Sequence, residues 1–326
     1  MAGVRRTRNW VLAVVAVGVL GGAGLVGVDM VRDDSGGTLP VAGTFSDSAA
    51  VIPSQTVPPQ SALPQSPPTR NAPPKTGPSA TELAAQDRAK RVAALNAALK
   101  KFAATAPEFS VAVLDRRTGQ RYSFRGTEKY ETASVVKVQV LACLLLQAQD
   151  ARRDLTPTEL SLAKRMIRRS DNDATTSLFS RLGRATGVGA CNKRLGLTQT
   201  KVSSSWGLTR TTVNDQVKLL ADLVDKSGPL DADSRELAYT LMSTVDDSQN
   251  WGVPAVARGG EKFTVKNGWL ARSTENYRWI INSVGRVTGP NTDVSIAVLS
   301  HGNSTMSSGI TVVQKVAKLT RQHLKY

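Results

Sequence analysis

The sequence predicts an α+β domain: an antiparallel sheet of about five strands flanked by terminal helices, with an all-helical subdomain inserted between the second and third strands. Two neighbouring segments predict the first strands. Residues 109–114 alternate in polarity, and a second extended run begins at Arg121 after a turn containing Gly119. Three further strand candidates, 263–269, 279–287 and 293–300, come late in the chain. Helical patterns precede, separate and follow the two groups of strands.

Local signals predict where the helices begin. Ser79 and Glu82 have the spacing of a capping box, and the apolar face after them predicts a helix to about residue 102. Thr156 and Glu159 form a second box, which predicts a helix to about residue 169. The remaining helices are expected from Ser134, near Ala174, over 212–225 and 231–245, and around Ile310, Val313 and Ala317.

The residues before position 80 are expected to lie outside the folded domain, which covers 80–326. Within 1–32, three arginines precede an uncharged apolar run over 10–28, long enough for a membrane-spanning helix. We expect an uncleaved membrane anchor or a signal peptide, with the domain outside the cytoplasm. No cysteine closely follows the run, so a lipid-anchored cysteine is not available. Residues 33–79 hold ten of the chain's 15 prolines and predict a disordered linker, with a proline-rich ligand as the alternative.

Composition narrows the classes of function. The net charge is +16, of which residues 1–79 carry only +2, so the folded domain is strongly basic. Aromatics are only 5% of the chain and do not interleave with basic runs, so we expect an anionic envelope or membrane surface rather than nucleic acid. Two histidines and two cysteines exclude most catalytic zinc centres and iron–sulfur clusters, and no cofactor or metal is expected. Cys143 and Cys191 are expected either as a disulfide or as buried thiols, and the protein as a monomer.

The first candidate for chemistry is the pair Ser134 and Lys137. On a helix these side chains lie on one face, and a desolvated lysine amine can take the proton of a serine hydroxyl. Ser134 would also lie at a helix N-terminus, where backbone N–H groups favour developing negative charge. Ser161 and Lys164 have the same spacing but fall within a predicted helix, so we interpret them as a chance match.

Two more polar motifs follow. Ser170-Asp171-Asn172 comes after a predicted helix: the serine hydroxyl would relay a proton, and the Asn172 amide would hold a substrate amide. Lys266-Asn267-Gly268 lies on a predicted strand, where the lysine would attract a carboxylate and the glycine would let substrate approach the backbone. Each motif alone is weak, because S-D-N is common at helix caps and lysines are common on exposed strands.

In this order and setting the three motifs resemble the class A β-lactamases and penicillin-binding proteins. The resemblance runs from about Thr81 to the C-terminus and implies that fold. It implies Ser134 as the acylated nucleophile, Lys137 as general base, Ser170 as proton relay and Lys266 as electrostatic anchor. It further implies substrate contacts at Asn172, Asn267 and Gly268, and an oxyanion hole formed by the backbone N–H groups of Ser134 and Trp269.

The sequence departs from the family pattern in three ways. The third motif is Lys-Asn-Gly, so an amide replaces a hydroxyl at Asn267. The segment from Ser134 to Ser170 is short. No Glu occurs between Leu160 and Arg235, and residues 196–212 contain no carboxylate to activate a deacylating water. We therefore expect an acyl-enzyme with β-lactams or D-alanyl peptides and slow β-lactam hydrolysis.

Several alternatives remain open at this level. The same fold would also suit a D,D-peptidase or esterase, or a cell-envelope-binding domain without catalysis. His301 is expected as a turn residue after the last strand, with a place in the site wall as the alternative, and His323 as solvated. The tryptophans Trp206, Trp251, Trp269 and Trp279 are expected in the core or the site wall.

Overall fold

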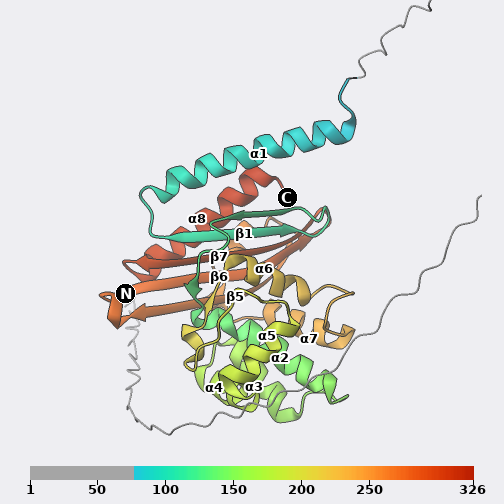
Figure 1. Ribbon diagram of the computed structural model, residues 1–326, viewed down its shortest axis with the longest axis vertical. Coiled ribbons are helices and arrows are strands. Elements are labelled where there is room, and N and C mark those ends of the chain that lie inside the picture. The colour runs from blue at the N-terminus through green and yellow to red at the C-terminus, as the bar shows by residue number, and fades with distance from the viewer. Residues whose placement is uncertain (1–76) are drawn as a thin grey trace, which may run out of the picture. The chain divides into compact units, whose positions relative to one another are not determined.

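The structure is a computed structural model that describes residues 77–326, and its centre is a five-stranded antiparallel sheet (Figure 1). The strand order is β2-β1-β7-β6-β5, so the sheet joins the first two strands of the domain to its last three. The strands of this sheet are β1 (Phe109–Asp115), β2 (Arg121–Phe124), β5 (Lys262–Arg272), β6 (Arg278–Gly289) and β7 (Thr292–Asn303). The predicted α+β class, the five strands and the antiparallel pairing are confirmed.

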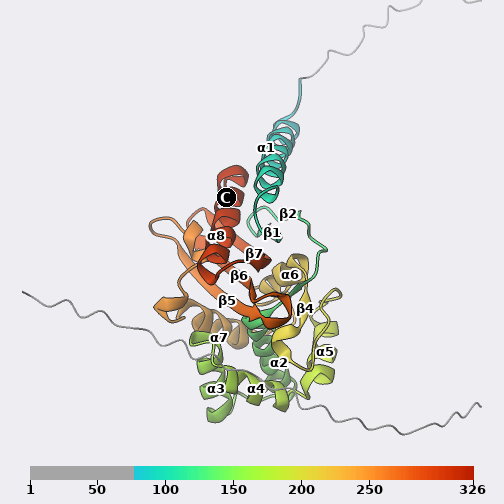
Figure 2. The ribbon, with the colours of Figure 1, turned by 90° about the vertical axis from the view of Figure 1, so that its left-hand side faces the viewer.

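Helices lie on both faces of this sheet (Figure 2). One face is covered by α1 (Ala80–Ala103) and α8 (Met306–Leu324), which pack on each other. The inserted helices are α2 (Val136–Asp150), α3 (Pro157–Arg168), α4 (Asn172–Arg181), α5 (Arg184–Arg194), α6 (Val213–Asp222) and α7 (Ala232–Ser243). Both predicted capping boxes form, at Ser79 and at Thr156.

Alternation along the strands separates two hydrophobic cores. On β1, Val111 and Val113 face the core under α1 and α8, whereas Ala112 and Leu114 face the core of the inserted helices. This is the period-2 pattern expected of a strand buried on both faces. The sheet is therefore the wall between the two cores and contributes side chains to each.

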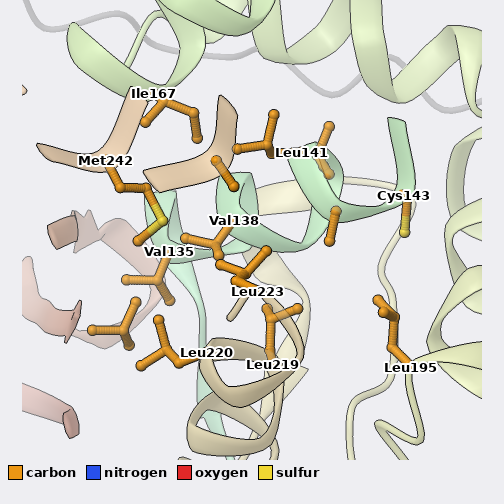
Figure 3. Packing of buried hydrophobic residues seen from close by; sticks show 14 of the residues in the cluster. Val135, Val138, Leu141, Cys143, Ile167, Leu195, Leu219, Leu220, Leu223 and Met242 are labelled. Carbon is orange, nitrogen blue, oxygen red and sulfur yellow. The ribbon is translucent and has the colours of Figure 1, made fainter. Parts of the chain in front are cut away.

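The inserted subdomain is built around α2, which is almost completely buried (Figure 3). Val135, Val138 and Leu141 pack among side chains of α3, α6 and α7. A disulfide between Cys143 and Cys191 joins α2 to α5, which decides between the two expected states of the cysteines. The sequence did not predict α5, because Gly187 and Gly189 weaken its helical pattern.

The expectation for His301 is wrong, and the expectations for the N-terminal region fall outside the described residues. His301 is not a turn residue: β7 continues to Asn303, and the His301 side chain lies 2.8 Å from a Glu108 carboxylate oxygen. The expected anchor and nearly all of the linker, over 1–76, lie outside the described residues. Within 77–326, no helix is both long and apolar enough to cross a membrane.

Candidate active site

Ser134 lies at the junction between the sheet and the inserted subdomain. It is the middle residue of a 3-10 turn, η1 (Ala133–Val135), which leads directly into α2. The strand β3 (Tyr130–Glu131) precedes this turn and pairs with β4 (Arg210–Thr211), which comes later in the chain, as a short two-stranded ribbon. Ser134 is half-buried, and its hydroxyl has no hydrogen-bond partner among residues 77–326. The hydroxyl is therefore free to meet a substrate at the N-terminal end of a buried helix.

Gly268 on β5 holds the turn of Ser134 against the sheet. A β-carbon at this position would lie 2.8 Å from the Ser134 amide nitrogen and 2.8 Å from the Thr132 carbonyl oxygen. Any side chain would push β5 and η1 apart, so only glycine permits this approach. The Lys-Asn-Gly motif therefore lies directly against the turn that carries Ser134, and the role of Gly268 is to let the two backbones approach each other.

Lys137 projects from the first turn of α2 and is fully buried. Its Nζ donates to the Ser170 carbonyl oxygen at 2.6 Å, to Asn172 Oδ1 at 2.8 Å and to Ser170 Oγ at 3.1 Å. Burial lowers the pKa of this amine to about 7, although the nearby Asp171 carboxylate acts in the opposite direction. Near neutral pH, part of the Lys137 population is therefore an uncharged amine.

Ser170 links the two lysines of the site. Its hydroxyl oxygen also accepts a hydrogen bond from Lys266 Nζ at 3.0 Å. Lys266 lies on β5, is fully buried, and donates in addition to its neighbouring backbone carbonyl and to Gln249 Oε1. Burial first, and the charge of Lys137 second, hold the Lys266 pKa well below its usual range. The three predicted motifs thus meet at one hydroxyl.

The turn between α3 and α4 places Ser170 and Asn172. Ser170 has a left-handed backbone with φ of 57°, and Asp171 caps α4 by accepting from the Ala174 amide. Arg165 donates to the other Asp171 oxygen and steadies the cap. As a result Ser170 is buried against both lysines, while Asn172 is exposed and offers its amide N–H group to the outside.

Asn267 occupies a different place from the one expected. Its side chain is fully buried, and both of its donated hydrogen bonds go to backbone carbonyls, of Gln249 at 2.7 Å and of Trp251 at 3.0 Å. The expected substrate contact at Asn267 is therefore corrected to a structural role. Neighbouring residues alternate across a strand, so the amide of the Lys-Asn-Gly motif points away from the lysine that precedes it.

Trp206 closes the lysine side of the site. It lies on η2 (Trp206–Leu208), within the loop that the sequence showed to lack a carboxylate, and its ring centre is 5.1 Å from Lys137 Nζ. Its indole N–H donates to Thr176 on α4 at 3.2 Å. No Asp or Glu side chain of the described residues forms an ion pair or hydrogen bond with Lys137 or Lys266. An indole therefore lies beside the Lys137 amine, and no carboxylate of the described residues contacts it.

Sequence reasoning missed two polar residues that support the site. Gln249 accepts from Lys266 and, through its own amide, donates to the Arg168 carbonyl at 3.1 Å. Asn282 on β6 donates to the Glu131 and Thr132 carbonyls, at 2.9 and 3.0 Å, and so holds the approach to Ser134. Asn282 could have been found from the sequence, because it is an amide within the apolar run of β6. Gln249 lies in a polar turn, where an amide is not unusual. The matching pair Ser161 and Lys164 is exposed on α3 and distant from these contacts, as expected of a chance match.

This arrangement agrees with the comparison to known families. Residues 90–160 and 156–324 match the β-lactamase enzyme family. The chain belongs to this family. The match includes all of the residues that form the lysine–serine network, and the predicted family is confirmed.

Two lipoproteins of mycobacteria are similar to part of the chain. The lipoproteins named LppW of Mycobacterium tuberculosis and of Mycobacterium bovis are each 32% identical to the chain over 196 residues. The match covers 58% of this chain and 61% of each relative, so the chain spans less than two thirds of their length.

Solved class A β-lactamases share the fold. A β-lactamase from Xanthomonas campestris aligns with a TM-score of 0.60 at 17% identity, covering 73% of this chain and 97% of its own. The chromosome-encoded β-lactamase of Vibrio parahaemolyticus aligns with a TM-score of 0.61 at 16% identity, covering 71% and 99%. At these identities the likeness shows the fold, and the chemistry must be argued from the site itself.

Proposed function

We propose that this protein is a serine acyl-transfer enzyme that forms a covalent acyl-enzyme at Ser134 with β-lactams or D-alanyl peptides. The observation that carries the proposal is the buried network in which Lys137 and Lys266 both donate to the Ser170 hydroxyl. Burying two amines is costly, and a purely structural core would not need them. Perturbed pKa values in such a cluster are typical of catalytic sites.

In the proposed reaction, the neutral Lys137 amine takes the Ser134 proton as the hydroxyl oxygen attacks the carbonyl carbon. The backbone N–H groups of Ser134 and Trp269 stabilise the oxyanion. Ser170, bonded to both lysines, passes a proton to the leaving nitrogen as the C–N bond breaks. A substrate carboxylate near Lys266 raises the pKa of that amine and keeps it charged, while Asn172 binds the substrate amide.

Release of the acyl group is proposed to be slow. Hydrolysis needs a base that activates water next to the ester, and the loop beside Lys137 supplies the Trp206 indole, which cannot accept a proton. In the presence of β-lactams, most of the enzyme is therefore expected to accumulate as the acyl-enzyme, which is inhibited. This separates formation of the acyl-enzyme, which the network supports, from turnover, which it does not.

Intact mass spectrometry after exposure to benzylpenicillin tests both steps. We expect the protein mass to increase by one intact penicillin and to stay increased over many minutes. Ser134→Ala should remove the increase, whereas Ser161→Ala, on the chance match, should leave it unchanged. Absence of a covalent adduct on the wild-type protein would refute the acylation step, and rapid return to the unmodified mass would refute slow release.

A location outside the cytoplasm is proposed for the domain. The Cys143–Cys191 disulfide is typical of oxidising compartments, and the apolar run at 10–28 supplies a means of export or anchoring. The LppW relatives are lipoproteins by name, but the only cysteines of this chain are paired in the disulfide. We therefore propose that the apolar run at 10–28, as an anchor or as a signal peptide, brings the domain out of the cytoplasm.

A further inference from the structure

A cavity lies on the face of the sheet that α8 covers, opposite the inserted helices. It has a volume of about 670 Å³ and opens between the C-terminal end of α8 and the segment that follows η4 (Val253–Val256). Its charged lining residues are Arg258, Lys318, Arg321 and Lys325. None of the residues of the lysine–serine network contributes to it, so it is a separate feature of the domain.

The charge of this cavity is almost all of one sign. No Asp or Glu side chain of the described residues lines it. Glu261, which lies behind the wall, forms an ion pair with Arg321 at 2.7 Å and accepts from the Thr292 hydroxyl. Arg258, Lys318 and Lys325 are exposed and form no ion pair with any residue of 77–326. Three uncompensated cations therefore surround the opening.

Arg321 shows that the cavity is more than a basic patch of surface. Its side chain is only 7% exposed, yet two guanidinium nitrogens, Nε and Nη1, have no hydrogen-bond partner among the described residues. Leaving donors of a buried guanidinium unpaired carries a free-energy cost, so Glu261 compensates this charge only in part, and the guanidinium carbon lies 5.2 Å from the centre of the Tyr326 ring. Cations in the last turn of a helix also offset the helix dipole, but that explains neither Arg258, which comes from another segment, nor the unpaired nitrogens.

We propose that this cavity binds the phosphate group of an organic phosphate ester. The exposed Arg258 guanidinium and the Lys318 and Lys325 amines, with the Arg321 guanidinium beneath them, suit an oxyanion that accepts several hydrogen bonds at once. The volume is in the range of small-molecule sites and exceeds what a bare inorganic ion fills, so the phosphate carries an organic group. Such esters occur free in solution and as the head groups of anionic lipids.

The test uses the full chain in neutral detergent. Isothermal titration measures binding of glycerol 3-phosphate and of glycerophosphoglycerol, the soluble head group of phosphatidylglycerol, with sodium chloride at equal ionic strength as the blank. We expect saturable binding that weakens by at least about tenfold in Arg258→Glu with Lys318→Glu, because two charge-assisted contacts are lost. If the variant with both charges reversed does not fold, Lys318→Gln, which only removes one charge, takes its place and should also weaken binding.

A matched control separates the site from general attraction. Lys164→Glu with Arg181→Glu makes the same change of net charge on the inserted helices and should bind the esters as the wild type does. Tighter binding of glycerophosphoglycerol identifies a lipid head group as the source, and tighter binding of glycerol 3-phosphate identifies a soluble monoester. Equal weakening in both double variants, or no saturable binding to the wild type, would overturn the proposal.

Discussion

The central residues of the site are two buried lysines whose amines share one hydroxyl. Lys137 and Lys266 lie within hydrogen-bonding distance of the same Ser170 oxygen, at 3.1 and 3.0 Å. Two positive charges so close together repel, and burial penalises each of them, so the network favours one charged and one neutral amine. This is the condition that a lysine general base requires near neutral pH.

Acylation should depend on pH through Lys137. The rate constant for penicillin acylation is expected to rise with pH and to reach half of its plateau near pH 7, because only the neutral amine accepts the Ser134 proton. Lys137→Arg should lower the rate constant by about 100-fold or more at every pH, since a guanidinium stays charged. Stopped-flow measurement between pH 5.5 and 9 checks this, and a flat wild-type profile would rule Lys137 out as the base.

Gly268 provides a second test at the level of one residue. Gly268→Ala places a methyl group 2.8 Å from the Ser134 amide nitrogen, which should destabilise the domain by about 1–3 kcal/mol and slow acylation by about 100-fold. Gly189→Ala on α5 is the matched control, because nothing lies within 4 Å of its added β-carbon. Urea unfolding and penicillin labelling measure both effects. Unchanged labelling in Gly268→Ala would show that the close approach is not needed.

At the scale of elements, α2 connects the chemistry to the core. Its N-terminal turn carries Lys137, and the apolar run behind it, Val138 to Leu146, is buried from every side. A helix that is apolar on nearly every face packs inside a protein, as α2 does. The sequence did not predict α5, which is joined to α2 by the disulfide, by a buried hydrogen bond from the Gln139 amide to Asn192 and by an ion pair between Arg194 and Asp150.

Removing that disulfide should loosen α5 without abolishing the site. Cys143 and Cys191 are 48 residues apart, and closing a loop of this length stabilises a domain by about 4 kcal/mol in the chain-entropy description. Cys143→Ala with Cys191→Ala should lower the free energy of unfolding by up to that amount, as measured with urea. Penicillin labelling at low temperature should persist, because no network residue lies on α5. A double variant as stable as the wild type would contradict this.

At the scale of the whole domain, the two cores are expected to unfold together. The core of the inserted helices also contains Val284, Ala297 and Leu299, which belong to the sheet. The same strands bury their alternate residues in the other core, so losing one core exposes the wall of the other. The site lies where the inserted helices meet the edge strand β5, and depends on both.

Leu141→Ala tests this coupling. Leu141 is fully buried on α2, and its truncation should cost about 2–5 kcal/mol. We expect one cooperative transition, at the same reduced denaturant midpoint by circular dichroism and by tryptophan fluorescence. Leu83→Ala, at a side chain 52% exposed on α1, should change stability by less than about 0.5 kcal/mol. Two separate transitions in Leu141→Ala would show that the cores are independent.

Features that depend on local spacing follow from the sequence alone. Strand alternation and both capping boxes depend on residues a few positions apart, and so does the spacing within each of the three motifs. The missing carboxylate of the loop at 196–212 was also visible, since it is a matter of composition. These patterns act through neighbouring backbone and side-chain geometry, which hardly depends on the rest of the fold.

The tertiary fold sets how distant segments meet. It paired Cys143 with Cys191, turned Asn267 into the interior and placed Trp206 over Lys137. It also placed Arg258 beside the C-terminal end of α8, where the two form a cavity that no local sequence pattern predicts. Burial, desolvation and the pKa of an amine are set by every group around it, and those groups come from separate parts of the chain.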